Sequence, residues 1–292
     1  MSLGSALFEL PSPFDAPGNR VLMLEPPSAD AERLRAQLLE DTYGRPYVVD
    51  DGERRYLHFD RSLIQSAMRL AAPNALDVRY TQKMMSFLLF QTRPRRIVLI
   101  GLGGGSLVKF CRCRLPAAQL VVVDNNPDVI ALRGAFCVPP DGPGLQVLEA
   151  DGADYLGRTD KGIDVLLVDA FDRRGYAAGL AGQEFFEAAK AKLAGSGVLV
   201  VNLAGDETAY AGLIGTVMQV FDDQVVVVPV REDDNQVLLA FKRAGFEPNW
   251  RQLRNLAKEL RARYGLDFPD FLVKIERAAK LGLARREAER GH

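Results

Sequence analysis

The sequence predicts an α/β protein in which a mostly parallel sheet with an antiparallel edge follows a small β-rich N-terminal domain. One reason is a glycine-rich turn at residues 101–105, which joins an apolar, β-branched run to a helical pattern. Another is the alternation of strand-like and helical patterns from residue 96 to 221, which is typical of βα units. The last is a pair of strand patterns at residues 224–230 and 236–241. The polar segment between them is too short for a crossover helix, so this pair must be an antiparallel hairpin.

Composition restricts the classes of partner. With 292 residues, 48% hydrophobic and 26% charged, the chain has the make-up of an ordinary globular protein that can bury a full core. A net charge of −1, without a long run of one sign, argues against nucleic acid or an anionic membrane as a partner. No apolar run approaches the roughly 20 residues that a membrane span needs. Because the start of the chain also lacks an export signal, we expect a cytoplasmic protein.

Few residues are suited to binding a metal. The three cysteines, Cys111, Cys113 and Cys137, have the wrong spacing for a zinc site, and their odd number favours a reducing compartment. Only two histidines are present, His58 and His292. We therefore expect no metal, and chemistry that depends on carboxylates, tyrosines and substrate positioning.

The N-terminal domain is expected to span residues 1–76. Residues 1–19 are rich in proline and are expected to be irregular, and residues 30–41 have helical periodicity. Short strands are expected at residues 20–25, 46–50 and 54–59. The last two are joined through Asp50-Asp51-Gly52, which is a strong hairpin signal.

The second domain is expected to span residues 77–292 and to open with one amphipathic helix over residues 77–92. Further strands are expected at residues 96–100, 120–123, 145–150, 163–168 and 197–202. Further helices are expected at residues 106–113, 127–136, 183–193, 206–221 and from residue 250 to the end. A parallel sheet that ends in an antiparallel hairpin is typical of the class I S-adenosylmethionine-methyltransferase-like variant of the Rossmann fold.

The glycine turn is a candidate nucleoside site. Its glycines let the backbone approach a ligand, and free N–H groups at the start of the following helix face that ligand. These glycines are Gly101, Gly103, Gly104 and Gly105. Asp124 ends the next strand, where a carboxylate can accept both ribose hydroxyls. The alternative is a tight turn followed by a solvated aspartate, since Ser106 stands where the dinucleotide fingerprint has its third glycine.

More carboxylates follow the later strands of the predicted sheet. Asp151, Asp169 and Asp172 fall at the same edge as Asp124, and such an edge suits a cationic or hydroxyl-rich ligand. For Asp151 the alternative is a cap on the helix that follows it, and the two roles are compatible. The alternative for Asp169 and Asp172 is a salt bridge within the loop. The small-residue segment 173–182 is suited to be a mobile lid that excludes water from these carboxylates.

Several motifs, in order, resemble the spermidine synthase family, the polyamine aminopropyltransferases. They are YTQKM at 80–84, IGLGGGS at 100–106, EADGADYL at 149–156 and DVLLVDAFD at 164–172. The resemblance covers about residues 80–241 and, more loosely, the β-rich N-terminal domain. It implies that Gln82 and the glycine loop contact the nucleoside, and that Asp124 holds its ribose. It further implies that Asp151 and Gly152 lie near the adenine.

For the amine half of the site, the resemblance implies that Asp172 is the base that activates the amine. Asp169 supports it, and Tyr80 belongs to the same substrate site. The chain also departs from the family pattern here. Gly104 stands where aminopropyltransferases carry an aspartate, and Ala170 and Phe171 replace the two serines of the Asp-Ser-Ser-Asp motif.

The resemblance implies transfer of an aminopropyl group from decarboxylated S-adenosylmethionine to a diamine such as putrescine, without a metal. A second hypothesis is a methyltransferase that uses intact S-adenosylmethionine. It is favoured by Gly104, where the family's aspartate is missing. It is also favoured by Arg173 and Arg174, which could bind the carboxylate that only intact S-adenosylmethionine carries. A third is a family member that binds nucleoside but has lost catalysis. The family commonly forms homodimers, so a homodimer is expected.

Overall fold

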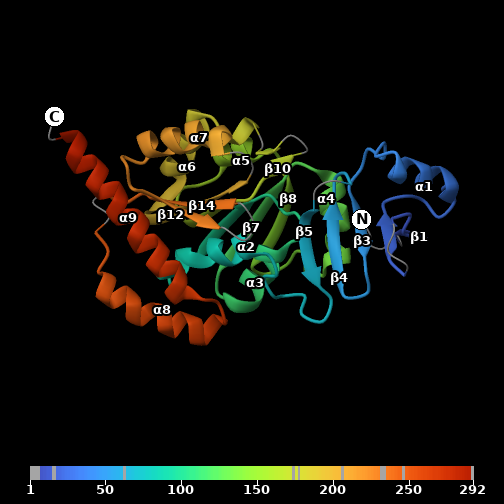
Figure 1. Cartoon of the computed structure of the whole chain (residues 1–292), viewed down its shortest axis with the longest axis horizontal. Helices are drawn as coiled ribbons and strands as arrows, with labels where there is room; N and C mark the ends of the chain where they lie inside the picture. The colour runs from blue at the N-terminus through green and yellow to red at the C-terminus, as the bar shows by residue number, and fades with distance from the viewer. Residues whose placement is uncertain are drawn as a thin grey trace.

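The computed structural model describes residues 7–14, 18–61, 64–172, 175–176, 178–204, 207–230, 235–244 and 247–290. Figure 1 shows an antiparallel sheet at one end of the molecule, a larger sheet with helices on both faces in the middle, and α8 and α9 at the other end. This arrangement confirms the predicted α/β class. In the described part of the chain, no helix is both long and apolar enough to cross a membrane.

The N-terminal sheet has five antiparallel strands in sequential order. They are β1 (Phe8–Pro11), β2 (Arg20–Met23), β3 (Tyr47–Asp50), β4 (Arg54–His58) and β5 (Ile64–Arg69). β2, β3 and β4 match predicted strands. The expectation that residues 1–19 are irregular was wrong at β1, because residues 8–11 pair with β2. β5 was not predicted.

The helix of this region, α1 (Ala31–Leu39), begins at a polar cap and covers one face of the sheet. Asp30 accepts hydrogen bonds from the backbone N–H groups of Glu32 and Arg33, which satisfies two otherwise unpaired donors of the first turn. The other face of the sheet packs against the larger one, since Leu22 and Leu57 belong to the same buried cluster as the central strands. The N-terminal sheet is thus continuous in packing with the large core. The division of the chain at residue 76 stays a prediction.

The large sheet has the order β13-β14-β12-β9-β6-β7-β8. Its strands are β6 (Arg96–Ile100), β7 (Gln119–Asp124), β8 (Leu145–Glu149), β9 (Ile163–Val168), β12 (Leu193–Ala204), β13 (Val225–Val230) and β14 (Asn235–Phe241). β14 runs antiparallel to both β12 and β13, whereas the other neighbours pair in parallel. The antiparallel hairpin at the sheet edge is therefore confirmed.

Helices cover both faces of this sheet (Figure 1). They are α2 (Arg79–Met84), α3 (Ser106–Arg114), α4 (Pro127–Leu132), α5 (Gly152–Arg158), α6 (Gln183–Lys192), α7 (Glu207–Val220), α8 (Trp250–Tyr264) and α9 (Phe268–Arg290). Side chains of β6 alternate between two cores. Val98 and Ile100 join the cluster under α5, α6 and α7, whereas Ile97 and Leu99 join the cluster under α3, α8 and α9.

One predicted helix is divided in two. Residues 77–92 were expected to form a single α-helix, but α2 ends at Met84 and a 3₁₀ helix follows over Met85–Leu89. Every side chain of this 3₁₀ helix is buried, including Phe87. The segment therefore lacks the polar face of an amphipathic helix, and burial on all sides decides its path.

The order of the strands fixes where a ligand can bind. From β6 the chain proceeds to β7 and β8 on one side, and then returns to β9 on the other side of β6. In open α/β sheets the crevice at the carboxyl ends of the strands, where the order reverses, is the ligand site. The N–H of Asp169 donates to the carbonyl of Ile100 at 2.9 Å, which ties β9 to β6 at that crevice.

Candidate active site

A cavity of about 620 Å³ lies at the carboxyl ends of β6, β7, β8 and β9, facing the N-terminal sheet. Its size is that of a site for a small molecule. The N-terminal region contributes Gly44, Pro46, Phe59, Gln65 and Ser66. The large sheet and its loops contribute Gly101, Gly103, Asp124, Asp151, Gly152 and Asp169.

Glycine is required in the loop after β6. Gly101 has a φ of +96°, and a Cβ there would lie 2.1 Å from the carbonyl oxygen of Asp169. Gly105, at φ +66°, precedes α3, and a Cβ there would lie 2.2 Å from Cγ2 of Val138. Gly101 and Gly103 line the cavity, whereas Gly104 and Gly105 are not among the described residues that line it.

Asp124 is held at the cavity by backbone donors. Its two carboxylate oxygens accept from the N–H of Leu102 at 2.7 Å and from the N–H of Asn126 at 2.8 Å. Burial raises the pKa of Asp124, and these backbone hydrogen bonds oppose the rise. The side chain is thus a fixed acceptor at the end of β7, in the place predicted for a group that holds ribose hydroxyls.

Asp151 has both of the arrangements that the sequence left open. It caps α5, because its Oδ1 accepts from the N–H groups of Ala153 at 2.8 Å and Asp154 at 3.1 Å. It also lines the cavity, as does Gly152 beside it. A Cβ at Gly152 would lie 2.6 Å from Cγ2 of Ile100, so the start of α5 packs closely on β6.

Asp169 follows β9 and has neutral hydrogen-bond donors on both oxygens. The amide of Asn202 donates to its Oδ1 at 2.9 Å, and the hydroxyl of Tyr80 donates to its Oδ2 at 3.3 Å. Burial raises the pKa of Asp169 to about 6, against the lowering effect of the two hydrogen bonds. Tyr80 and Asp169, which were predicted to share the substrate site, therefore contact each other at the cavity wall.

Asp172 can be placed only by its backbone. It ends β10 (Phe171–Asp172), which pairs antiparallel with β11 (Gly175–Tyr176). Its side chain, like Arg173 and Arg174 of the predicted lid, lies outside the described part of the structure. The role of Asp172 as a base stays a prediction.

Gln82 is not brought together with the other predicted residues. Its amide donates to the carbonyl of Leu76 at 2.8 Å, and its oxygen accepts from Arg79 at 3.4 Å. It is not among the described residues that line the cavity. Its immediate neighbours Tyr80 and Thr81 do line it, so α2 reaches the site through different positions.

Sequence reasoning missed Gln65 and Ser66 on β5, because the strand itself was not predicted. Both residues line the cavity, and Nε2 of Gln65 is buried without a hydrogen-bond partner among the described residues. A buried amide without a partner is costly, so Gln65 is a candidate to bind ligand. No signal in the sequence marked this short strand, in which apolar and polar residues alternate only loosely.

Ser66 also explains the departure at Gly104. A Cβ at Gly104 would lie 2.7 Å from Oγ of Ser66 and 3.1 Å from Cδ1 of Phe136. The position that carries an aspartate in the resembled family is therefore filled by side chains of this chain. The polar group beside Gly104 is instead the hydroxyl of Ser66, and Gln65, the residue before it, also lines the cavity.

An ion pair joins the two walls of the cavity. Arg45 contacts both carboxylate oxygens of Asp128, with Nε at 3.0 Å and Nη2 at 2.7 Å. Gly44 and Pro46, on either side of Arg45, line the cavity from the N-terminal region. Asp128 lies in the first turn of α4, next to the cavity-lining Val129. The pair thus fixes the N-terminal region against the segment that follows Asp124.

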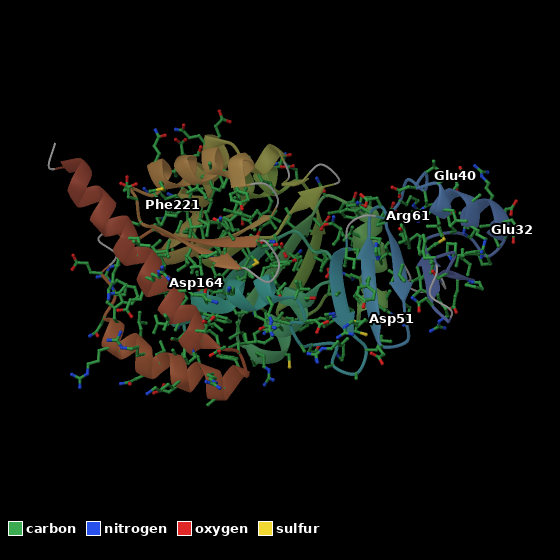
Figure 2. The ribbon with its side chains drawn as sticks, viewed as in Figure 1. Glu32, Glu40, Asp51, Arg61, Asp164 and Phe221 are labelled. Carbon is green, nitrogen blue, oxygen red and sulfur yellow. The ribbon has the colours of Figure 1, made fainter. Side chains whose placement is uncertain are left out.

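One further carboxylate of the DVLLVDAFD motif lies too far from the cavity to belong to the site. Asp164, in the same motif as Asp169, lies near the amino end of β9, and Figure 2 labels it on the side of the molecule away from the N-terminal sheet. Its Oδ2 accepts from the N–H groups of Arg95 and Arg96. Asp164 therefore lies at the edge of the sheet opposite the cavity. In the described part of the chain, no three His, Cys, Asp or Glu side chains are grouped so that they could hold a metal ion.

Curated relatives decide the family. The chain is 37% identical over 230 residues to a polyamine aminopropyltransferase of Chromobacterium violaceum, covering 78% of this chain and 88% of that protein. It is 34% identical over 231 residues to a polyamine aminopropyltransferase of Neisseria meningitidis, with the same coverage. The chain belongs to the polyamine aminopropyltransferase family. No family model matches the chain.

Solved structures support the fold of this aminopropyltransferase family member. A probable spermidine synthase of Corynebacterium glutamicum matches with a TM-score of 0.62 at 20% identity, over 76% of this chain and 86% of that one. A spermidine synthase in complex with the transition-state analogue AdoDATO matches with a TM-score of 0.61 at 14% identity, over 79% and 81%. Human methyltransferase-like protein 13, in complex with SAH, matches with a TM-score of 0.59 at 19% identity, over 64% of this chain and 93% of that one. The predicted methyltransferase-like sheet is thereby confirmed.

Proposed function

We propose that this enzyme transfers the aminopropyl group of decarboxylated S-adenosylmethionine to a diamine such as putrescine, giving spermidine and methylthioadenosine. Family membership supports the reaction class. The observation that carries the proposal is the environment of Asp169. Its carboxylate lines the cavity and is contacted by the neutral donors Asn202 and Tyr80, which leaves its charge to be balanced by a cationic ligand.

The nucleoside half of the substrate is assigned to the glycine loop and the ends of β7 and β8. Asp124 would accept the ribose hydroxyls, since backbone donors already fix its orientation. Gly101 and Gly103 let the backbone approach the ligand. Asp151 and Gly152 would lie beside the adenine. Gln82, which the resemblance also assigns to the nucleoside, would have to give up its bond to Leu76 to reach it.

The amine half is assigned to the cavity wall that includes Tyr80, Gln65 and Asp169, together with Asp172, three positions after Asp169 in the chain. A diamine has pKa values near 10, so it arrives protonated and cannot attack until one proton is removed. Asp172 is assigned as the base that accepts this proton, with Asp169 holding the positive charge of the substrate nearby. Both aspartates follow β9, in the loop over the carboxyl end of the sheet.

The chemical step is a displacement at carbon. The amine nitrogen forms a bond to the aminopropyl carbon next to the sulfonium, and the carbon–sulfur bond breaks with its electron pair going to sulfur. The sulfonium thereby leaves as the neutral thioether methylthioadenosine, and the proton of the amine goes to the carboxylate of Asp172 and then to water. Because the sulfonium is already an activated leaving group, holding the two substrates in line supplies much of the rate.

The variant Asp172→Asn tests the assignment of the base. We expect turnover with decarboxylated S-adenosylmethionine and putrescine to fall by about 10²- to 10⁴-fold, the range for general base catalysis, while methylthioadenosine binding by calorimetry is unchanged. Asp154→Asn is the matched control, because that carboxylate is 70% exposed on α5. Turnover of Asp172→Asn within a few-fold of wild type would remove Asp172 from this role.

A methyltransferase is the second candidate, and one observation favours it. Ser66 and Phe136 occupy the space beside Gly104, so the amine half of the cavity differs there from the pattern of the aminopropyltransferases. If this difference changes the reaction, the enzyme releases S-adenosylhomocysteine from intact S-adenosylmethionine. If it abolishes the reaction, methylthioadenosine binds tightly and no amine is turned over.

We further propose a homodimer, on the basis of the family resemblance. Light scattering coupled to size-exclusion chromatography tests this directly, with twice the mass of the 292-residue chain as the expected result. A single-chain mass at micromolar concentration would contradict it. The cytoplasmic location stays a prediction.

A further inference from the structure

Two buried asparagines lie in β12 and β14, two neighbouring apolar strands of the large sheet. Asn202 lies in β12 between Val201 and Leu203, and it is 1% exposed. Asn235 begins β14, the neighbouring strand, and it is 9% exposed. Burying a side-chain amide is costly unless its polar atoms are hydrogen-bonded. The hydrogen bonds of these two amides therefore indicate their role.

The two amides form a directed chain of hydrogen bonds that ends at the cavity. Nδ2 of Asn235 donates to Oδ1 of Asn202 at 2.8 Å, and Nδ2 of Asn202 donates to Oδ1 of Asp169 at 2.9 Å. An ionised carboxylate only accepts, so Asn202 must present its NH₂ group to Asp169. Asn235 secures this orientation, because it donates to the oxygen at the other end of the same amide.

Asp169 is thus fixed from two sides. The hydroxyl of Tyr80 on α2 donates to its Oδ2 at 3.3 Å, while Asn202 on β12 donates to Oδ1. Both donors are neutral, so they orient the carboxylate without neutralising its negative charge. Charged neighbours of the same cavity are the carboxylates of Asp124 and Asp151. The side chain of Asp172, three positions after Asp169, lies outside the described part of the structure.

We propose that Asn202 and Asn235 are positioning residues, which orient the carboxylate of Asp169 toward the cationic amine of the substrate. This inference rests on the proposed function and adds two residues to it. The hydrogen bond from Asn202 also lowers the pKa of Asp169, against burial, which raises it to about 6. Without that bond the carboxyl would hold its proton at a higher pH and would lose its attraction for a cation.

The test replaces the amides by leucine, a residue of similar size. In the double variant Asn202→Leu/Asn235→Leu the hydrogen bond between the two amides is removed together with both of its partners, which is close to neutral for stability. Oδ1 of Asp169 loses the donor from Asn202, and this loss lowers stability. We expect the melting temperature to fall by roughly 3–12 °C, while kcat/KM for putrescine, measured well below that transition, falls by roughly 10- to 100-fold, the effect of one hydrogen bond to a charged group.

Three further readouts separate positioning from a merely structural role. The acidic limb of the pH profile of kcat/KM for putrescine should move to higher pH. The affinity for methylthioadenosine, measured by calorimetry, should stay within about twofold. Asn202→Leu alone should lose at least as much activity as the double variant, because Asn235 acts only through Asn202.

Tyr264→Phe is the matched control, since the hydroxyl of Tyr264 on α8 is buried without a hydrogen-bond partner among the described residues and Tyr264 does not line the cavity. It should leave the pH profile unchanged. A double leucine variant with wild-type kcat/KM and an unmoved acidic limb would overturn the inference. If the wild-type enzyme itself forms no spermidine, the proposed function fails first, and the two failures are thereby distinguished.

Discussion

Gly101 is the position at which the backbone of the site tolerates least change, and Gly101→Ala tests this. Its φ of +96° is one that L side chains rarely adopt, and this costs an alanine about 1–2 kcal/mol. The new Cβ would lie 2.1 Å from the carbonyl oxygen of Asp169, whereas ordinary contacts begin at 3.4 Å. Because that oxygen belongs to the backbone, β6 or the end of β9 must shift to relieve the contact.

Together these effects should lower the free energy of unfolding by roughly 2–5 kcal/mol, since forced shifts in a packed region cost about 1–3 kcal/mol more. At about 2–4 °C for each kcal/mol in a chain of this size, the melting temperature should fall by roughly 4–20 °C. The displacement also moves Asp169, so activity should fall further than the loss of folded protein explains.

Differential scanning calorimetry and the KM for decarboxylated S-adenosylmethionine measure the two effects. Gly157→Ala in α5 is the matched control, because a Cβ at that position meets nothing within 4 Å. It should leave activity unchanged and raise stability by up to about 1 kcal/mol. Equal melting temperatures and KM values for Gly101→Ala and wild type would refute the account of the glycine loop.

Three more predictions concern the cavity walls. Asp124→Asn should raise the KM for the nucleoside substrate at least tenfold and leave the KM for putrescine unchanged in steady-state assays. For the Arg45–Asp128 pair, a double-mutant cycle of Arg45→Met and Asp128→Asn should give a coupling of about 0.5–1 kcal/mol in urea unfolding, modest because Arg45 is 41% exposed. Both single variants should also raise the KM for the nucleoside. Finally, the pKa of Asp169 is about 6 in the folded chain, against an ordinary value of 3.8, so the unfolded chain loses this proton first. Between about pH 4 and pH 6 the free energy of unfolding of the ligand-free enzyme should therefore fall as pH rises, and Asp169→Asn should remove that part of the slope.

The sequence was sufficient for the large sheet because its strands are long, apolar and closed by distinctive residues. The run before Gly101 and the hairpin after residue 224 were both recognisable from local pattern alone. β1 and β5 were not, since short strands of mixed polarity gain their stability from neighbours across the sheet. The end of α2 at Met84 likewise depends on burial from all sides, which no local pattern reveals.

The site was predictable only where the chain order itself brings residues together. Asp124 ends one strand of the parallel sheet, and Asp151 and Asp169 follow the ends of the next two, so they had to meet at one edge. Gln65 was out of reach, because it approaches that edge from another sheet. Asn202 and Asn235 were out of reach for a different reason. They sit in apolar strands, and only the pairing of β12 with β14 places their amides in one chain of hydrogen bonds.

The measurement that tests the central claim most directly is a competition between co-substrates. The purified enzyme is incubated with putrescine and equal amounts of S-adenosylmethionine and its decarboxylated form, and the products are identified by mass spectrometry. Our account predicts methylthioadenosine and spermidine in equal amounts, with no S-adenosylhomocysteine. Release of S-adenosylhomocysteine, or the absence of any product although methylthioadenosine binds, would contradict it.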